Sequence, residues 1–375
     1  MKTYLYPPTF LLLFSCNTSP SSAPEQLVAT HQSVSQETPD TTLLQGQPVT
    51  QLSNNIESMF QDSKGNYWFG TQKHWLYKYD GKNLVQFTQQ HGLDCYQIQN
   101  IQEDAQGNIW LTTDGYKIIR FDGKKFTAFN VTDSTITNHV WNTEPNDLWF
   151  YGGGGPYRYA NNTFSQLFLS PNEQDQTYAQ QNPNKLSPYA VYSILKDKKG
   201  NLWFGTQSTG VCKYDPHWND EIGGGKSFTW FDQPILKGPA VLALFEDKNG
   251  NMWFGNNGGG LFVYDGKTVR NFTEEKGLSN REFRKSGKEG PGTLARIFCI
   301  NQDNDGNMWI GTVDAGVWKF DGKNLTNYTI KHGLPNNTVN KILKDGNSKL
   351  WFATRSDGVY TFDGNTFKKF EAATL

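Results

Sequence analysis

The residues that could carry chemistry or binding in this chain are isolated aromatic, basic and acidic side chains. They lie in irregular segments between predicted strands, and they are His74, Trp75, Tyr116, His139, Tyr189, Arg281, Glu282, Arg284 and Arg355. A Trp beside a His could stack against a sugar ring, and arginines could pair with a carboxylate or a sulfate. No paired carboxylates and no Ser-His-Asp set stand out. We therefore predict a binding site rather than a catalytic one, with no cofactor and no metal.

The elements that would position these residues come from one repeated phrase, whose fullest copy is Asp-Lys-Lys-Gly-Asn-Leu-Trp-Phe-Gly-Thr. Its seven copies centre on Trp68, Trp110, Trp149, Trp203, Trp253, Trp309 and Trp351. One Asp stands six residues before each Trp and another stands twelve residues after it, except around Trp149, where both are missing. A period of roughly 40–55 residues with internal turn signals indicates a repeat architecture.

Each copy predicts four short strands. The first has aliphatic residues twelve and nine positions before the Trp, such as Val191 and Ile194, and is rich in β-branched residues. An Asp-x-x-Gly-Asn turn then joins the first strand to the second, and Asp-Gly-Lys joins the third to the fourth. Seven such units predict an all-β fold, a seven-bladed β-propeller of four-stranded antiparallel blades over residues 52–375. The repeated Trp should lie between blades, and an open solenoid is the structural alternative.

The turn aspartates have a second interpretation as metal ligands. The run Asp303-Asn304-Asp305-Gly306-Asn307 comes nearest to a calcium loop. A calcium loop of the helical type needs a longer ligand series and a bidentate Glu downstream, and both are missing. We therefore predict that these aspartates stabilise turns.

The repeats resemble the two-component regulator propeller repeat family over residues from about 52 to 370. The resemblance includes the pieces that follow the fourth strand, Gly92-Leu93, Gly277-Leu278 and Gly333-Leu334-Pro335-Asn336-Asn337. In that family such propellers form the periplasmic sensor region of hybrid histidine kinases, which are typically associated with polysaccharide use in Bacteroidetes-like bacteria. The resemblance implies the fold and a sensor role. The sequence itself predicts one propeller and no kinase.

The predicted hairpins place both turn types at one end of the propeller, here called the turn end. The loops between second and third strands and the blade-to-blade connections then lie at the other end, the loop end. Irregular loops on a rigid scaffold often carry function, so we expect the site at the loop end, around the channel mouth. Trp75 stands where four other copies have Gly, so repeat packing does not explain it. The alternative to a binding role is that the Trp75 ring packs onto its own blade.

The other candidates also have structural alternatives. Arg281 and Arg284 lie with Lys285 and Lys288 in a basic cluster that could simply be a solvated loop. His139 could act as an acid or base, or it could be a hydrogen-bonded structural His.

Three function classes follow from these residues. The first is an envelope-anchored binding or sensor module for an extracytoplasmic ligand. The expected ligand is a glycan fragment or another small polar molecule, and a partner protein of the envelope is the other possibility. The second is a propeller lyase similar to streptogramin lyase, which uses a His, a Glu and a divalent ion at the channel mouth. In this chain, His139 and Glu282 could play the parts of that His and Glu. The third is a structural partner for another envelope protein.

The N-terminal segment predicts export. Residues 1–15 read as a signal peptide of the lipoprotein type, because Leu13-Phe14-Ser15-Cys16 resembles a lipobox in which Cys16 is lipidated. The apolar run is too short to span a bilayer as a helix, and a plain cleaved signal or a disordered start is the alternative. Residues 16–51, rich in Ser, Thr, Gln and Pro, should form a disordered tether. The predicted location is the periplasmic or outer-membrane surface, with a lipid anchor as the only membrane contact.

The charge of the chain narrows the choice of partners. A net charge of −1 without a basic run argues against nucleic acid, because such binding rests on clustered positive charge.

Overall fold

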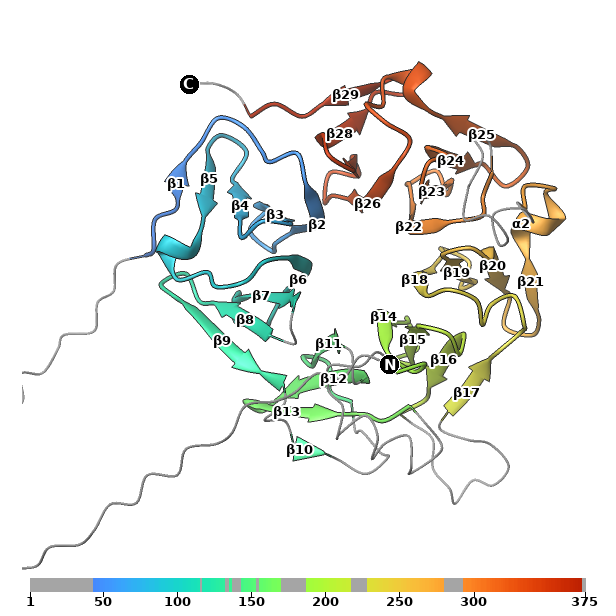
Figure 1. The fold of residues 1–375 in the computed structure, drawn as a ribbon, viewed down its shortest axis with the longest axis horizontal. Helices are drawn as coiled ribbons and strands as arrows, with labels where there is room; N and C mark the ends of the chain where they lie inside the picture. Colours follow the sequence, from blue (N-terminus) through green and yellow to red (C-terminus); the bar gives the residue numbers. More distant parts are fainter. Residues whose placement is uncertain are drawn as a thin grey trace, which may run out of the picture. The chain divides into compact units, whose positions relative to one another are not determined.

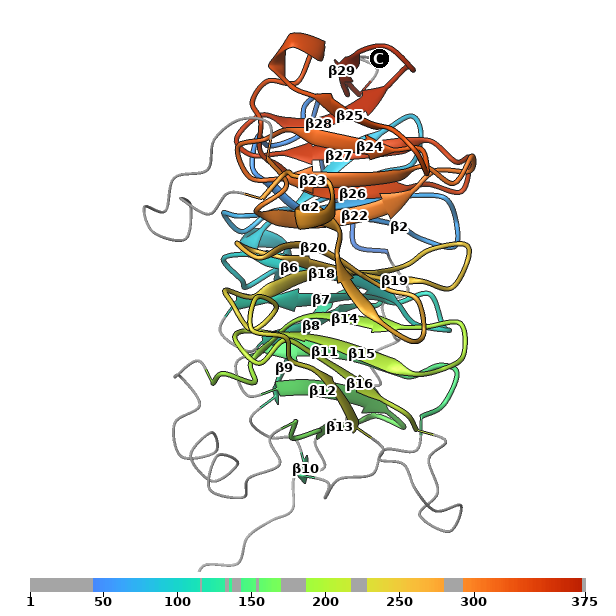
Figure 2. The ribbon, with the colours of Figure 1, turned by 90° about the vertical axis from the view of Figure 1, so that its right-hand side faces the viewer.

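The seven predicted units fold into seven sheets arranged in a ring, a seven-bladed β-propeller (Figure 1). This computed structural model describes residues 43–114, 117–131, 135–136, 143–152, 155–169, 187–216, 228–279 and 293–372. Figure 2 shows the ring from its side, with the strands running across its thickness and the connections at its two opposite ends. The prediction of the fold class is confirmed.

The first three blades are formed by residues up to Gln166. Blade 1 comprises β1 (Gln47–Pro48), β2 (Ile56–Gln61), β3 (Tyr67–Thr71), β4 (Leu76–Tyr79) and β5 (Leu84–Phe87). Blade 2 comprises β6 (Ile98–Glu103), β7 (Ile109–Thr113), β8 (Lys117–Phe121) and β9 (Phe126–Asn130). Blade 3 comprises β10 (Thr135–Ile136), β11 (Leu148–Gly152), β12 (Gly155–Ala160) and β13 (Thr163–Gln166).

The last four blades follow one regular antiparallel order. Blade 4 comprises β14 (Val191–Lys196), β15 (Leu202–Thr206), β16 (Val211–Tyr214) and β17 (Phe228–Phe231). Blade 5 comprises β18 (Val241–Glu246), β19 (Met252–Asn256), β20 (Gly260–Tyr264) and β21 (Val269–Asn271). Blade 6 comprises β22 (Ile297–Gln302), β23 (Met308–Thr312), β24 (Val317–Phe320) and β25 (Leu325–Tyr328). Blade 7 comprises β26 (Val339–Lys344), β27 (Leu350–Thr354), β28 (Gly358–Phe362) and β29 (Phe367–Lys369).

The helical elements whose full length the structure describes are short pieces that follow outer strands. They are η1 (Gln89–His91), α2 (Phe272–Glu275) and η5 (Ile330–His332). Gly92 and Gly333 end the two 3-10 turns in the left-handed conformation, which explains the Gly-Leu pieces of the repeat.

Blade 3 departs from the regular pattern. Its sheet order is β10-β13-β12-β11, and β10 pairs with the outermost strand in parallel, whereas the repeat predicts antiparallel strands only. This is also the copy that lacks both turn aspartates. Asp147 instead accepts hydrogen bonds from the Glu144 amide at 2.7 Å and the Arg158 side chain at 2.6 Å, so a different contact holds this hairpin.

The repeated Trp is a core residue in every blade, as predicted. All seven indoles are buried, with at most 7% of their surface exposed. In six blades the indole Nε1 donates to the Asp six residues earlier, over 2.7–3.0 Å. In blade 4 the other oxygen of that carboxylate, Asp197 Oδ1, accepts the backbone amides of Lys199 and Asn201. The aspartates therefore stabilise turns, as predicted, and they also fix the Trp.

The ring closes by packing blade 7 on blade 1. In the described part of the chain no strand of either blade joins the other sheet. The Tyr67 hydroxyl donates to Asp345 at 2.7 Å, the Gly346 amide donates to Gln61 at 2.6 Å, and the rings of Tyr67 and Trp351 lie 4.7 Å apart. At the edge of blade 1, β1 pairs with β5.

Candidate functional site

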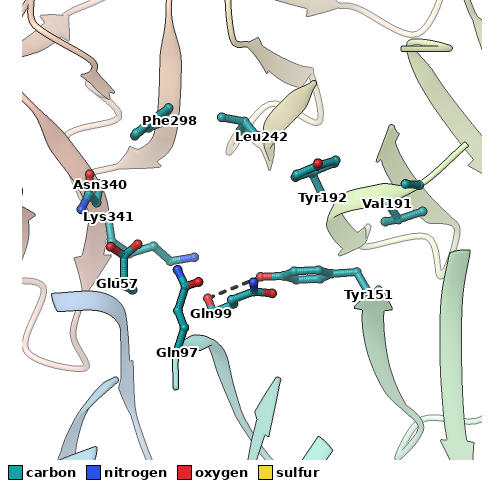
Figure 3. Close-up of a pocket in the computed structure, with 11 residues that line it drawn as sticks. Glu57, Gln97, Gln99, Tyr151, Val191, Tyr192, Leu242, Phe298, Asn340 and Lys341 are labelled. Carbon is teal, nitrogen blue, oxygen red and sulfur yellow. Dashed lines mark hydrogen bonds between the residues drawn. The ribbon is translucent and has the colours of Figure 1, made fainter. Parts of the chain in front are cut away.

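The strongest candidate site is a cavity of about 410 Å³ in the central channel. Its walls come from all seven blades, and Figure 3 shows the side chains around it. The lining residues are Glu57, Gln97, Gln99, Tyr151, Ala190, Val191, Tyr192, Leu242, Phe298, Asn340 and Lys341. The volume lies within the usual range of small-molecule sites, which combine apolar walls with a few polar groups.

In six blades the innermost strand places one side chain on the channel by simple alternation. The first aliphatic residue of these strands is fully buried between blades, as Ile56, Ile98 and Val241 are at 0% exposure. Successive side chains of a strand point to opposite faces, so the next residue faces the axis. In six blades this residue lines the cavity: Glu57, Gln99, Tyr192, Leu242, Phe298 and Asn340.

Sequence reasoning missed this set, although a signal was present. Each of these residues directly follows the aliphatic residue twelve positions before the repeated Trp. That position varies from blade to blade, while the aliphatic position before it does not. The expected place for function was the irregular loops, whereas the channel-facing position lies inside a regular strand.

Tyr151 reaches the cavity from the second strand of blade 3, where four other copies have Gly. A Cβ at Gly70, the matching residue of blade 1, would lie 2.6 Å from Ile98 of the next blade. In blade 3 the same position carries a phenol that points across the channel toward Gln99, with its hydroxyl 3.4 Å from the Gln99 carbonyl oxygen (Figure 3). Burial raises the pKa of Tyr151, and the charge of Glu57 raises it further.

Two ionisable side chains stand in the channel from blades 1 and 7. Burial raises the pKa of Glu57, while Arg355 partly offsets that shift. Burial lowers the pKa of Lys341, although part of the side chain remains accessible from the cavity. Across the described residues, neither charged group forms an ion pair or a side-chain hydrogen bond. Ionisable groups perturbed by burial inside a cavity are typical of functional sites.

Four of the residues predicted for the site are described, and they lie at the loop end outside the lining of the cavity. Trp75 is half-buried and packs on the core shared by blades 1 and 7. His74 is exposed, and its ring meets Tyr96 edge-on at 5.2 Å. Tyr189 is half-buried and meets Trp230 edge-on at 5.7 Å. Arg355 is exposed and acts on the site through its charge near Glu57.

The remaining candidates cannot be placed in the fold. The following candidates lie outside the described residues: Tyr116, His139, Arg281, Glu282, Arg284 and the lipidation candidate Cys16. Within the described chain, no group of three or more His, Cys, Asp or Glu residues could hold a metal ion. The helices that the structure describes include none that is long and apolar enough to span a membrane.

Known structures share this fold at low sequence identity. The extracellular domain of a putative hybrid two component system from B. thetaiotaomicron matches with 21% identity and a TM-score of 0.59, over 84% of this chain and 40% of that one. Virginiamycin B lyase from Staphylococcus aureus matches with 15% identity and a TM-score of 0.58, over 84% of this chain and 98% of the lyase. PorZ, a surface component of the type-IX secretion system of Porphyromonas gingivalis, matches with 18% identity and a TM-score of 0.56, over 82% of this chain and 46% of PorZ. These likenesses show the fold alone.

The repeats themselves match a family model. Among curated proteins, none matches the chain by sequence. Six segments match the model described as two component regulator propeller, at residues 50–73, 92–115, 185–208, 235–258, 292–314 and 333–356. The segment around Trp149 is the repeat without a match, in agreement with its missing aspartates and its irregular sheet. The chain is therefore a β-propeller built from two component regulator propeller repeats.

Proposed function

We propose that this chain is an envelope-anchored binding or sensor module whose propeller takes up a polar extracytoplasmic ligand, with a glycan fragment as the ligand class. One observation carries the proposal. The channel cavity combines the amides of Gln97, Gln99 and Asn340 with aromatic rings and two charged groups. Sugars are bound by such sets, because amides pair with hydroxyl groups and aromatic faces cover the apolar faces of the ring.

The related structures support this class of function without identifying the ligand. The chain spans 40% of the hybrid two component system domain, so that protein's whole activity does not transfer to this one. The loop-end residues Trp75, Arg281 and Arg284 stay a predicted second contact region for the same ligand. The alternative lyase activity rests on His139 and Glu282, which the structure does not place.

Thermal unfolding of the full chain tests the binding proposal. A ligand that binds only the folded state stabilises it by about 2.7 kcal/mol at a concentration 100 times its Kd. We expect at least one member of a panel of glycan fragments to raise the melting temperature. A shift with divalent ions alone would favour the lyase, and no shift with any fragment would leave a protein partner as the better explanation and contradict the glycan proposal.

The lipid anchor is a separate proposal with its own test. Cys16→Ser removes the thiol that would carry the lipid, so the variant should move from the membrane fraction to the soluble periplasmic fraction. Fractionation followed by immunoblotting measures this, with Ser15→Ala as a control that keeps the thiol. A Cys16→Ser variant that stays with the membrane would contradict the anchor.

A further inference from the structure

We propose that the ligand of the channel carries an acid group, a carboxylate or a sulfate, and that Lys341 is the residue that binds it. This inference rests on the proposed function and adds the chemical class of the ligand. The first argument is the place of Lys341 in the fold. It is the third residue of β26 and lies opposite Ala353 of β27.

In three other blades the corresponding residue serves the contact between blades, whereas blades 2 and 5 carry Asn100 and Ala243 there. The Ser58 hydroxyl donates to the carbonyl of Ile98 at 2.8 Å, and the Ser193 hydroxyl donates to the carbonyl of Val241 at 2.9 Å. The Cys299 thiol lies 3.5 Å from the carbonyl of Val339 in the same way. Each of these short side chains ties one inner strand to the next blade.

Lys341 does not make this contact. Its longer side chain extends from β26 into the channel, past the position of Glu57 in the view of Figure 3. In the part of the chain that the structure describes, its ammonium has neither a hydrogen-bond acceptor nor a carboxylate partner. A long charged side chain does not improve the packing between two blades, so packing does not explain a lysine at this position.

The balance of charges in the channel decides the sign of the ligand. Glu57 is partly compensated by Arg355, whose charge lowers its pKa against the effect of burial. Among the described residues, no carboxylate lies within ion-pair distance of the Lys341 ammonium, and burial lowers its pKa, while the nearby Cys299 thiol is neutral with a pKa raised to about 12. Lys341 is therefore the cavity cation that lacks a direct anionic partner among the described residues. The Lys341 side chain is only partly exposed, so an anion bound beside its ammonium would offset the cost of desolvating this charge.

The other walls of the cavity suit the rest of an acidic sugar. Gln97, Gln99 and Asn340 offer both donors and acceptors to hydroxyl groups. Tyr192 and Phe298 offer ring faces from two further blades. A neutral sugar would satisfy these groups but would leave the Lys341 ammonium desolvated and unpaired. We therefore expect the cavity to favour the acidic member of a matched pair of sugars.

Paired ligands and one matched control variant test this inference. The full chain is titrated by calorimetry with neutral, uronate-bearing and sulfated forms of the same glucose, galactose and mannose oligosaccharides. We expect an acidic form to bind at least about tenfold more tightly than its neutral partner, in line with a charge-assisted hydrogen bond. Uronate and sulfate forms distinguish the two acid groups. Lys341→Met should abolish this preference and Lys341→Arg should keep most of it.

Lys344→Met is the control, since it removes the same charge from the exposed end of the same strand. It should leave the preference unchanged. If neutral and acidic forms bind equally to the wild type, or if Lys341→Met keeps the preference, the inference is wrong while the proposed function stands. If no oligosaccharide of either kind binds, the proposed glycan function is wrong as well.

Discussion

Asp345→Ala is expected to lower the free energy of unfolding by about 3–5 kcal/mol, because it removes one carboxylate that serves four donors. Asp345 accepts the Tyr67 hydroxyl at 2.7 Å and the Trp351 indole at 2.8 Å, and it accepts the amides of Asn347 and Lys349. The first two donors are buried and belong to different blades. The substitution therefore weakens a hairpin and the closure of the ring together. Urea unfolding at pH 7 measures the loss.

Asp321→Ala is the matched control. Asp321 also accepts two backbone amides of a turn, but it is exposed and holds no Trp. Its loss should be much smaller, because water replaces it as the acceptor. Equal losses for both variants would show that the bonds to Tyr67 and Trp351 add little.

The stability difference between the wild type and Asp345→Ala should depend on pH. Burial opposes ionisation of Asp345, but hydrogen bonds from Trp351, Tyr67 and two amides outweigh it and hold its pKa below the usual value. A carboxylate with a lowered pKa in the folded state stabilises the fold above its unfolded pKa of about 3.9. That stabilisation is lost as the pH falls through the folded pKa. The gap between wild type and Asp345→Ala should therefore shrink below about pH 4.

Gly205→Ala should lower the free energy of unfolding by about 2–3 kcal/mol through overpacking between blades 4 and 5. A Cβ at this position would meet the Ser193 hydroxyl and would lie 2.5 Å from the Val241 carbonyl oxygen, the pair joined by the hydrogen bond between these blades. Both groups belong to tightly packed inner strands, so neither can move without opening the seam. Urea unfolding again gives the value.

Gly346→Ala is the control for this substitution. A Cβ there would meet the end of the Gln61 side chain at 3.4 Å, which is ordinary contact distance. The stability of this variant should stay within about 0.5 kcal/mol of the wild type, as for a surface substitution. If Gly205→Ala were equally harmless, the Gly of the repeat would not reflect close approach of the neighbouring blade.

The repeat made the architecture predictable because each local signal pointed to the same structure. The spacing of the Trp gave the number of blades, and the Asp-Gly turns gave the hairpins and the two ends. The bond from each Asp to its Trp was not predicted, although the constant six-residue spacing and the shared loss around Trp149 were visible signals. The parallel strand β10 could not be foreseen, because no repeat signal marks Thr135 and Ile136.

The site was harder to predict because its residues are set by the closed ring. Glu57 and Lys341 are 284 positions apart in the sequence. Only closure of blade 7 on blade 1 brings both residues to one cavity. The exposed and aromatic candidates at the loop end were chosen by residue type. Trp75 illustrates the difficulty, because its departure from the repeat was correctly noted but its half-buried packing depends on a neighbour from another blade.

One calorimetric comparison tests most directly whether the channel is the ligand site. Leu242→Trp would fill the cavity from blade 5 without removing a polar group, whereas Trp75→Ala would remove an aromatic side chain at the loop end. Both full-chain variants would be titrated with the glycan fragment that raises the melting temperature of the wild type most. We predict that Leu242→Trp abolishes binding and that Trp75→Ala changes the Kd less than about fivefold, equivalent to about 1 kcal/mol. Unchanged binding by Leu242→Trp together with lost binding by Trp75→Ala would contradict the channel and place the site on the loops.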